Sequence, residues 1–207
     1  MKLYTSVGPN PHVVSVFLKE KGVDLETQTV DIRGGESRRE PYISTVNSRG
    51  QCPVLEIAPD NRLTEVTAIC EYLEEKHPTP PLIGTTAEER AQTRMWVRRL
   101  DLSIAEPLGN GFRASEGYEM FKDRFRVLPE AADGLKAIAQ DNLSWLNDDL
   151  GDKEFICGDR FTLADIHLYC FLSFGAKVGQ PLNPELTKVG NWFDRISERE
   201  SIKGKSQ

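Results

Sequence analysis

The stretch that decides the fold runs from residue 47 to residue 55, Asn47-Ser48-Arg49-Gly50-Gln51-Cys52-Pro53-Val54-Leu55. A short apolar run begins at Pro53, which we predict to be the first residue of a strand, where a missing backbone N–H is tolerated. The Cys52–Pro53 bond is a candidate for the cis isomer, which is accessible only at X–Pro bonds. A cis bond would turn the N–H and C=O of Cys52 toward an extended peptide ligand. A trans bond would leave Pro53 as an ordinary start of an edge strand.

Upstream of this stretch the pattern is strand, turn, helix, strand. Residues 2–5 are a strand candidate, and a turn rich in Gly and Pro follows. We predict a helix that begins near Pro11, has Asn10 as its N-cap and ends at Gly22. Residues 25–32, rich in Thr and Val, form the next strand candidate. The helix start beside Asn10 offers backbone N–H groups that stabilise an anion.

Downstream of the stretch we predict a hairpin followed by a helix. Residues 53–57 and 62–63 flank a turn and should pair as antiparallel strands. A helix should follow through Ile69 and the apolar residues spaced around it, capped by Thr64 or Glu65. The first module therefore has the order βαβ–ββα.

A proline-rich linker separates this module from a second one. Prolines at positions 78, 80 and 81 cannot continue a helix, so we divide the chain into residues 1–77, a linker 78–86 and residues 87–207. Two capping boxes in the second module, Thr86 to Glu89 and Thr162 to Asp165, predict helix starts. The helix after Thr162 is so apolar that it should be central. The other expected helices are a long one that residues 107–111 interrupt or end, one over 129–150 and one over 185–198.

Composition excludes several classes of protein. The 207-residue chain has a formal net charge of -6, which opposes a nucleic-acid partner. The N-terminus lacks the apolar stretch of a signal peptide, and no apolar run reaches the ~20 residues of a membrane helix. Cysteines and histidines are scattered, so we expect reduced thiols, no metal site and a cytoplasmic location. These residues are Cys52, Cys70, Cys157, Cys170, His12, His77 and His167.

Three short segments in this order resemble the cytosolic glutathione transferases over essentially the whole chain. They are Gly50 to Leu55, which resembles the family's cis-proline loop, Leu63 to Ile69, and the capping box within Phe161 to Ile166. The resemblance implies an α/β plus all-α protein with a thioredoxin-like N-terminal domain followed by an all-helical C-terminal domain. It also implies a cis bond before Pro53, and glutathione as co-substrate.

The resemblance further implies which residues hold the tripeptide. Gln51 matches a residue at the glycine end, and the backbone of Cys52 would pair with the cysteinyl unit. Glu65 matches the acid that holds the γ-glutamyl ammonium, unless it only caps the helix. The family usually has serine at the next position, so here the γ-glutamyl carboxylate would rely on the N–H of Val66 and the neighbouring hydroxyl. The implied binding set is Gln51, Cys52, Pro53, Glu65, Val66 and Thr67.

The residue that activates the sulfur departs from the usual family pattern. Most members place Tyr, Ser or Cys near the first helix start, where this chain has Gly8 and Pro9. Asn10 is the nearest side-chain donor, and some bacterial branches with a similar Pro-Asn pair use the asparagine. Ser6 is the second candidate. Each has a plainer interpretation, Asn10 as a helix cap and Ser6 as a turn hydroxyl.

Pro9, Phe112 and Tyr118 are our candidates for an apolar wall beside a small electrophile, although each is equally consistent with core or surface. The main functional hypothesis is conjugation of glutathione to that electrophile. The alternatives are a glutathione-dependent disulfide reductase or peroxidase, and a non-catalytic binding protein with the same fold. Arginines on the first long helix indicate either a solvated face or the contact of a homodimer, as is usual in the family. They are Arg90, Arg94, Arg98 and Arg99.

Overall fold

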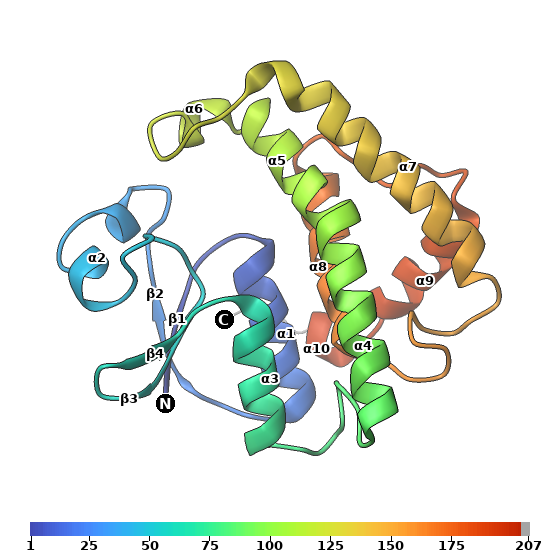
Figure 1. The fold of residues 1–207 in the computed structure, drawn as a ribbon, viewed down its shortest axis with the longest axis horizontal. Helices are drawn as coiled ribbons and strands as arrows, with labels where there is room; N and C mark the ends of the chain where they lie inside the picture. Colours follow the sequence, from blue (N-terminus) through green and yellow to red (C-terminus); the bar gives the residue numbers. More distant parts are fainter. Residues whose placement is uncertain (204–207) are drawn as a thin grey trace. The chain divides into compact units, whose positions relative to one another are not determined.

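The computed structural model describes residues 1–203, which belong to two compact units that divide between Leu82 and Ile83 (Figure 1). Unit 1 contains a four-stranded mixed sheet with helices, and unit 2 is built from helices. This confirms the predicted fold class, a thioredoxin-like domain followed by a helical domain.

The sheet of unit 1 has the strand order β2-β1-β3-β4. β1 pairs in parallel with β2 and antiparallel with β3, and β3 forms an antiparallel hairpin with β4. A parallel pair needs a crossover connection and an antiparallel pair only a turn, so the observed sheet realises the predicted βαβ–ββα order. The strands are β1 (Lys2–Thr5), β2 (Glu26–Thr29), β3 (Val54–Ala58) and β4 (Asn61–Leu63).

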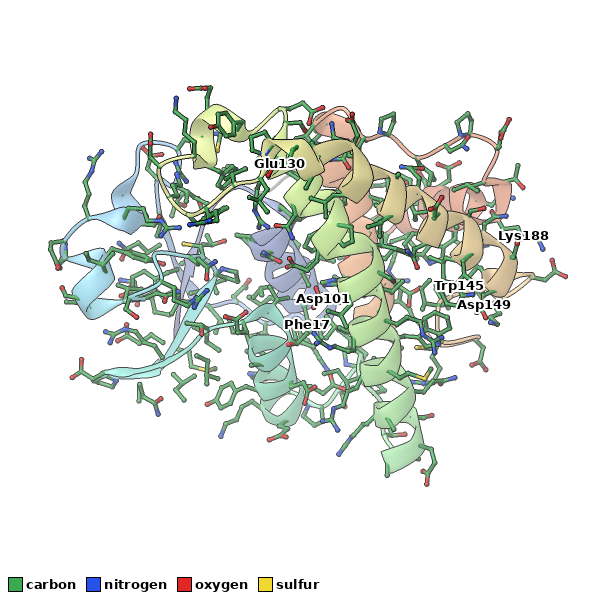
Figure 2. The ribbon with its side chains drawn as sticks, turned by 45° about the horizontal axis from the view of Figure 1, so that its top comes forward. Phe17, Asp101, Glu130, Trp145, Asp149 and Lys188 are labelled. Carbon is green, nitrogen blue, oxygen red and sulfur yellow. The ribbon has the colours of Figure 1, made fainter. Side chains whose placement is uncertain are left out.

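Two helices of unit 1, α1 (Pro9–Lys21) and α3 (Val66–Lys76), pack side by side. Their facing sides bury Phe17 (labelled in Figure 2) and Ile69 completely, together with Leu55 of β3. Burying a large apolar side chain contributes about 1.5–3 kcal/mol, so this layer supplies much of the stability of unit 1. The shorter elements η1 (Glu36–Arg38) and α2 (Tyr42–Thr45) lie between β2 and β3 in the sequence.

The prediction that Asn10 caps a helix beginning near Pro11 is wrong. The helix begins at Pro9, and its N-cap is Gly8, which makes no side-chain cap bond. Gly8 has φ 123° and ψ 168°, a backbone conformation open to glycine but costly for other residues. Proline suits the first helical position because an N–H at that position would have no partner within the helix, so its absence costs nothing. Asn10 therefore lies inside the first turn.

Unit 2 begins with the predicted capping box, in which Thr86 accepts from the Glu89 N–H and Glu89 bonds back to Thr86 N–H. The second box, between Thr162 and Asp165, also forms, and the helix that follows it is almost wholly buried, as predicted. The elements are α4 (Ala87–Leu100), η2 (Asp101–Ala105), α5 (Glu106–Ala114), α6 (Tyr118–Phe121), η3 (Pro129–Ala131), α7 (Ala132–Leu150), α8 (Leu163–Lys177), α9 (Thr187–Ser197) and α10 (Glu200–Lys203).

The prediction that residues 107–111 interrupt or end the long helix is wrong, because they lie inside α5. The irregularity comes earlier, where Asp101–Ala105 form a π-helical turn between α4 and α5. Pro107 lacks an N–H, and its ring would clash with the carbonyl of Ser103 in a regular helix. The wider turn before Pro107 relieves this clash, so the chain continues helically through the proline.

Within residues 1–203, no helix is both long and apolar enough to cross a bilayer. The four cysteines are free thiols, three of them buried and Cys52 half-buried.

Candidate functional site

Three connecting segments meet at one edge of the unit 1 sheet. The register pairs Tyr4, near the end of β1, with Val54, the first residue of β3. It also pairs Leu55 with Leu63, the last residue of β4. The segment after β1, the loop before β3 and the segment after β4 therefore emerge at the same edge. These segments are residues 6–8, 47–53 and 64–65.

The loop before β3 is held by two side chains that bond to the carbonyl of Gln51. The Tyr42 hydroxyl donates to this oxygen at 2.8 Å and the Asn47 amide donates at 3.0 Å. Asn47 also accepts from the Arg49 N–H through its side-chain oxygen, at 3.0 Å, and its carbonyl accepts from Gly50 N–H at 2.8 Å. These bonds fix the backbone on the N-terminal side of Cys52.

The Cys52–Pro53 peptide bond at the end of this loop is cis, as predicted. In residues 1–203, neither the N–H nor the C=O of Cys52 has a hydrogen-bond partner. A backbone donor and acceptor left unpaired beside a strand are ready to pair with an extended peptide.

The Cys52 thiol, in contrast, faces protein. Its sulfur lies 3.1 Å from the Tyr42 hydroxyl and packs with the Tyr4, Val30 and Val54 cluster. Burial raises the pKa of the Cys52 thiol, although the Tyr42 hydrogen bond acts in the opposite direction. Either group can be the donor in the hydrogen bond between the Cys52 thiol and the Tyr42 hydroxyl. The Cys52 sulfur is thus held by protein contacts, whereas the backbone N–H and C=O of this residue have no partner among the described residues.

Arg38 borders the same loop. Gly50 has φ 63°, and a Cβ on this residue would lie 2.7 Å from Arg38 Cδ and 2.6 Å from the Ser37 carbonyl oxygen. Only glycine fits this close approach. The side chain of Arg38 therefore lies against Gly50, where it adds positive charge beside the loop.

Glu65 is the N-cap residue of α3 and has φ 68° and ψ 125°. A non-glycine residue at positive φ costs about 1–3 kcal/mol, and such strain clusters at functional sites. The Glu65 side chain makes no capping bond and no ion pair or other hydrogen bond within residues 1–203. Its exposed carboxylate is therefore available to a cation, which speaks against the interpretation as a simple cap.

The start of α3 offers an anion site next to this carboxylate. Val66 and Thr67 are the first two helical residues, and their N–H groups have no carbonyl four residues back within the helix. Both residues are half-buried, and the helix dipole favours a negative charge at this end. The Glu65 carboxylate and the N–H groups of Val66 and Thr67 are thus neighbours. A carboxylate suits the ammonium group of an amino acid, and the N–H groups suit its carboxylate.

Asn10 supplies most of the hydrogen-bonding capacity at the start of α1. Pro9 and Pro11 have no backbone N–H, and the His12 N–H is bonded to the Gly8 carbonyl at 3.3 Å. The N–H and the side-chain amide of Asn10 have no partner among residues 1–203. An anion at this helix start would therefore bind chiefly to Asn10.

Ser6, the second candidate, uses its proton elsewhere. Its hydroxyl donates to the carbonyl oxygen of Val30 at 2.6 Å, which ties the segment after β1 to the residue after β2. This bond favours the interpretation as a turn hydroxyl over a role in activating a sulfur.

The expected apolar wall is divided between the units. Pro9 lies in unit 1, and Phe112 and Tyr118 lie in unit 2. All three are half-buried, so each retains some surface for a ligand. That they form one wall stays a prediction.

Sequence reasoning missed Tyr42, Asn47 and Arg38. All three act on the loop before β3, but no periodicity or motif links them to Cys52. Only the turn residues around Asn47 gave a signal, which was too general to assign a role. Within residues 1–203, no group of three or more His, Cys, Asp or Glu side chains is placed to hold a metal ion.

The fold defines a class of protein in which a thioredoxin-like unit is followed by an all-helical unit. Two family models match the sequence, the N-terminal domain of glutathione S-transferase over residues 1–75 and its C-terminal domain over residues 126–200. The chain belongs to the glutathione S-transferase family.

Individual relatives agree with this assignment. The chain is 32% identical to glutathione S-transferase F10 of Arabidopsis thaliana over 203 residues, covering 91% of this chain and 87% of the relative. It is 28% identical to glutathione S-transferase 2 of Saccharomyces cerevisiae over 206 residues, covering 96% and 86%. A solved structure of a glutathione S-transferase domain-containing protein of Marinobacter aquaeolei VT8 superposes with a TM-score of 0.90 at 32% identity, covering 98% of this chain and all of the other.

Proposed function

We propose that the protein is a glutathione transferase that binds glutathione at the sheet edge of unit 1 and conjugates it to a small electrophile. The observation that carries this proposal is the unpaired backbone N–H and C=O of Cys52. They match the backbone of the central cysteinyl residue of a tripeptide.

The two ends of the tripeptide fit the flanking groups. The γ-glutamyl ammonium pairs with the Glu65 carboxylate, and the γ-glutamyl carboxylate accepts from the amides of Val66 and Thr67. The glycine carboxylate lies toward Gln51 and the positive charge of Arg38.

Asn10 stabilises the sulfur as a thiolate in this proposal. A free thiol has a pKa of about 8.5, and lowering it by two units requires about 2.7 kcal/mol. One charge-assisted hydrogen bond supplies about 1.5–3 kcal/mol and a helix N-terminus about 0.3–1 kcal/mol. The thiol proton goes to solvent, the sulfur forms a bond to the electrophilic carbon, and the leaving group departs with its bonding electrons.

Replacing Asn10 tests this step. Asn10→Ala should raise the pKa of the bound thiol by about 1–2 units and lower kcat/KM for 1-chloro-2,4-dinitrobenzene about 10- to 100-fold at neutral pH, because one charge-assisted bond is lost. The activity should recover as the pH rises. Ultraviolet absorbance of the thiolate measures the pKa.

Ser6→Ala is the matched control, because its hydroxyl bonds to Val30. This variant should lose about 1 kcal/mol of stability and keep the thiol pKa. A shifted pKa in Ser6→Ala with none in Asn10→Ala would reverse the assignment. Faster reduction of a mixed disulfide than conjugation would identify the protein as a glutathione-dependent reductase.

Replacing Glu65 tests binding separately from chemistry. Glu65→Gln should weaken glutathione binding about 10- to 100-fold in calorimetry, since a charge-assisted bond of about 1.5–3 kcal/mol is lost. The wild type should lose a similar factor for an analogue whose γ-glutamyl amino group is replaced by hydrogen, and Glu65→Gln should not distinguish the two ligands. Glu75→Gln, an exposed change on the same helix, should bind like the wild type.

The proposal includes a cytoplasmic homodimer. Four large apolar side chains of unit 2 are 40–53% exposed: Met95 on α4, Leu102 on the π-helical turn, and Ile138 and Trp145 on α7. Figure 2 labels Trp145 on this helix. Exposed apolar groups on neighbouring helices are typical of a protein interface.

Ile138→Glu should convert the dimer to a monomer of 23.3 kDa, because it places an unpaired charge in an apolar contact. Sedimentation equilibrium measures the mass. Leu128→Glu, a similar change at an exposed residue outside these helices, should leave the dimer intact. A monomeric wild type would contradict the prediction.

A further inference from the structure

Unit 2 contains a cluster of four phenylalanine rings that the site in unit 1 does not involve. Phe112 of α5 meets Phe174 of α8 edge to face at 5.1 Å between ring centroids and Phe121 of α6 at 6.0 Å, and Phe125 lies 5.5 Å from Phe121. A Cβ on Gly117 would lie 2.8 Å from Phe112 Cζ. The backbone therefore closes directly over this ring and fixes its position.

Two arginines lie on these rings. The guanidinium carbon of Arg113 is 5.9 Å from the centroid of Phe121 and 5.8 Å from that of Phe125. The guanidinium carbon of Arg124 is 5.3 Å from the centroid of Phe121. We call these six residues the aromatic–arginine cluster: Phe112, Phe121, Phe125, Phe174, Arg113 and Arg124.

Arg113 is half-buried without a carboxylate partner. Its Nη1 donates to the side-chain oxygen of Asn110 at 2.8 Å, and Asn110 in turn donates to Glu106 at 3.0 Å. No carboxylate of residues 1–203 lies within ion-pair distance of the guanidinium. Burial lowers the pKa of Arg113, with Glu106 opposing this.

The neighbouring charges are paired, in contrast. Lys122 bonds to Glu119 at 2.5 Å, and Lys136 bonds to Glu116 at 2.6 Å. Glu116 and Glu119, two of the carboxylates closest to Arg113 in the sequence, are therefore paired with lysines and not with Arg113. Arg113 therefore retains donors in a fixed planar fork, which matches a carboxylate in a two-point contact.

The cluster also leaves apolar surface uncovered. Phe125 is 39% exposed, and Met120 and Leu128, which are close to it in the sequence, are 40% and 50% exposed. Soluble proteins seldom leave several large apolar groups together on the surface without a function. The exposed Phe125 ring beside a guanidinium that has no carboxylate partner fits a ligand that is itself flat, aromatic and negatively charged.

We infer that the aromatic–arginine cluster binds a small aromatic anion, with its carboxylate on Arg113 and its ring on the exposed Phe125. We further infer that the electrophilic substrate belongs to this chemical class, which rests on the proposed function. A small molecule suits the half-buried guanidinium better than an anionic membrane does, since the chain's net charge of -6 would repel such a surface.

Binding is tested without glutathione, so that it does not depend on the reaction. The probe is 3,5-dinitrobenzoate, which has no leaving group, and its neutral control is the methyl ester. In calorimetry the wild type should bind the acid at least 10-fold more tightly than the ester. Arg113→Met should abolish that preference and change the affinity for the ester less than 2-fold.

Three further variants keep the test sharp. Arg126→Gln, at an exposed arginine without a ring contact in the described part of the chain, should retain the full preference. Arg113→Lys, which keeps the charge but not the fork, should retain part of it. Phe125→Leu should weaken the binding of acid and ester alike, about 3- to 10-fold, and covers the case in which Arg113→Met fails to fold.

Two outcomes would overturn the inference. One is equal binding of acid and ester by the wild type. The other is that anionic vesicles bind through Arg113 and the acid does not bind.

The substrate class is tested with 4-chloro-3,5-dinitrobenzoate and its methyl ester, from which glutathione displaces chloride. The measured quantity is the ratio of kcat/KM for the acid to kcat/KM for the ester. This ratio should be at least 10-fold higher in the wild type than in Arg113→Met. Conjugation of the ester alone would overturn the substrate class and leave the proposed function intact. Binding of the acid through Arg113 with no conjugation of either compound would support the site and overturn the proposed function.

Discussion

Asp165→Ala is expected to lower the free energy of unfolding by about 3–5 kcal/mol. Asp165 is fully buried in α8 and accepts from Ile156 N–H and Trp192 Nε1 at 2.9 Å, and from Thr162 N–H at 3.0 Å. Alanine would leave all three N–H groups buried and unsatisfied, and each such group costs about 1–3 kcal/mol. Urea unfolding at neutral pH measures the loss.

The pH dependence of this contribution has a definite sign. Burial raises the pKa of Asp165 from 3.8 to about 6, against the opposing effect of its hydrogen bonds. The folded state therefore holds a proton that the unfolded state has released between about pH 4 and pH 6. The stability from this group is complete below pH 4 and is lost as the pH rises through 6. A shift of about two units corresponds to about 2–3 kcal/mol.

Asp165→Asn isolates this effect, since asparagine does not titrate in this range. The difference in unfolding free energy between wild type and Asp165→Asn should be larger at pH 4.5 than at pH 7. A difference that shrinks at acid pH would mean that the donors from Ile156, Thr162 and Trp192 outweigh the cost of burial. The pKa of Asp165 would then lie below its ordinary value.

These residues also show what the sequence can and cannot reveal. Thr162 and Asp165 are three positions apart, so their capping box is visible as a local pattern. Trp192, which completes the carboxylate's partners, lies 27 positions from Asp165 and belongs to another helix. The pattern predicts that Asp165 caps a helix, but the number of donors it satisfies depends on tertiary packing.

The same distinction applies to the candidate site. The order of strands and helices, the loop at Cys52 and the acid at Glu65 follow from short motifs and their spacing. The start of α1 was misplaced because the positive φ of Gly8 depends on how the chain leaves β1, which proline and cap preferences do not encode. Tyr42 lies ten positions before Cys52, and only the folded loop brings its hydroxyl to the Gln51 carbonyl.

An ion pair that no sequence pattern indicated, between Lys21 and Glu74, joins the end of α1 to α3. The Lys21 side chain is completely buried and that of Glu74 is 9% exposed. Lys21 also donates to the Pro80 carbonyl, and Glu74 accepts from Leu82 N–H at 3.2 Å. The pair therefore fastens the segment that ends unit 1 to its two helices.

Breaking this pair is expected to be as costly as losing Asp165. Lys21→Met or Glu74→Gln alone should lower the free energy of unfolding by about 3–5 kcal/mol, because the remaining charge or polar group stays buried without its partner. Lys76→Met, at an exposed lysine of α3, should change it by less than about 0.5 kcal/mol. Urea unfolding compares the three.

The double variant Lys21→Met, Glu74→Leu separates the ion pair from the contacts to residues 80 and 82. Replacing a buried pair with apolar groups is often close to neutral, so the double variant should cost clearly less than the sum of the single changes. The remaining cost, about 1–3 kcal/mol, reflects the unsatisfied backbone groups of Pro80 and Leu82. Because both groups lose their partner in the double variant, limited proteolysis should cut residues 77–85 faster there than in the wild type, even where stability is recovered. Additive single changes, or unchanged proteolysis, would show that the pair does not hold this segment.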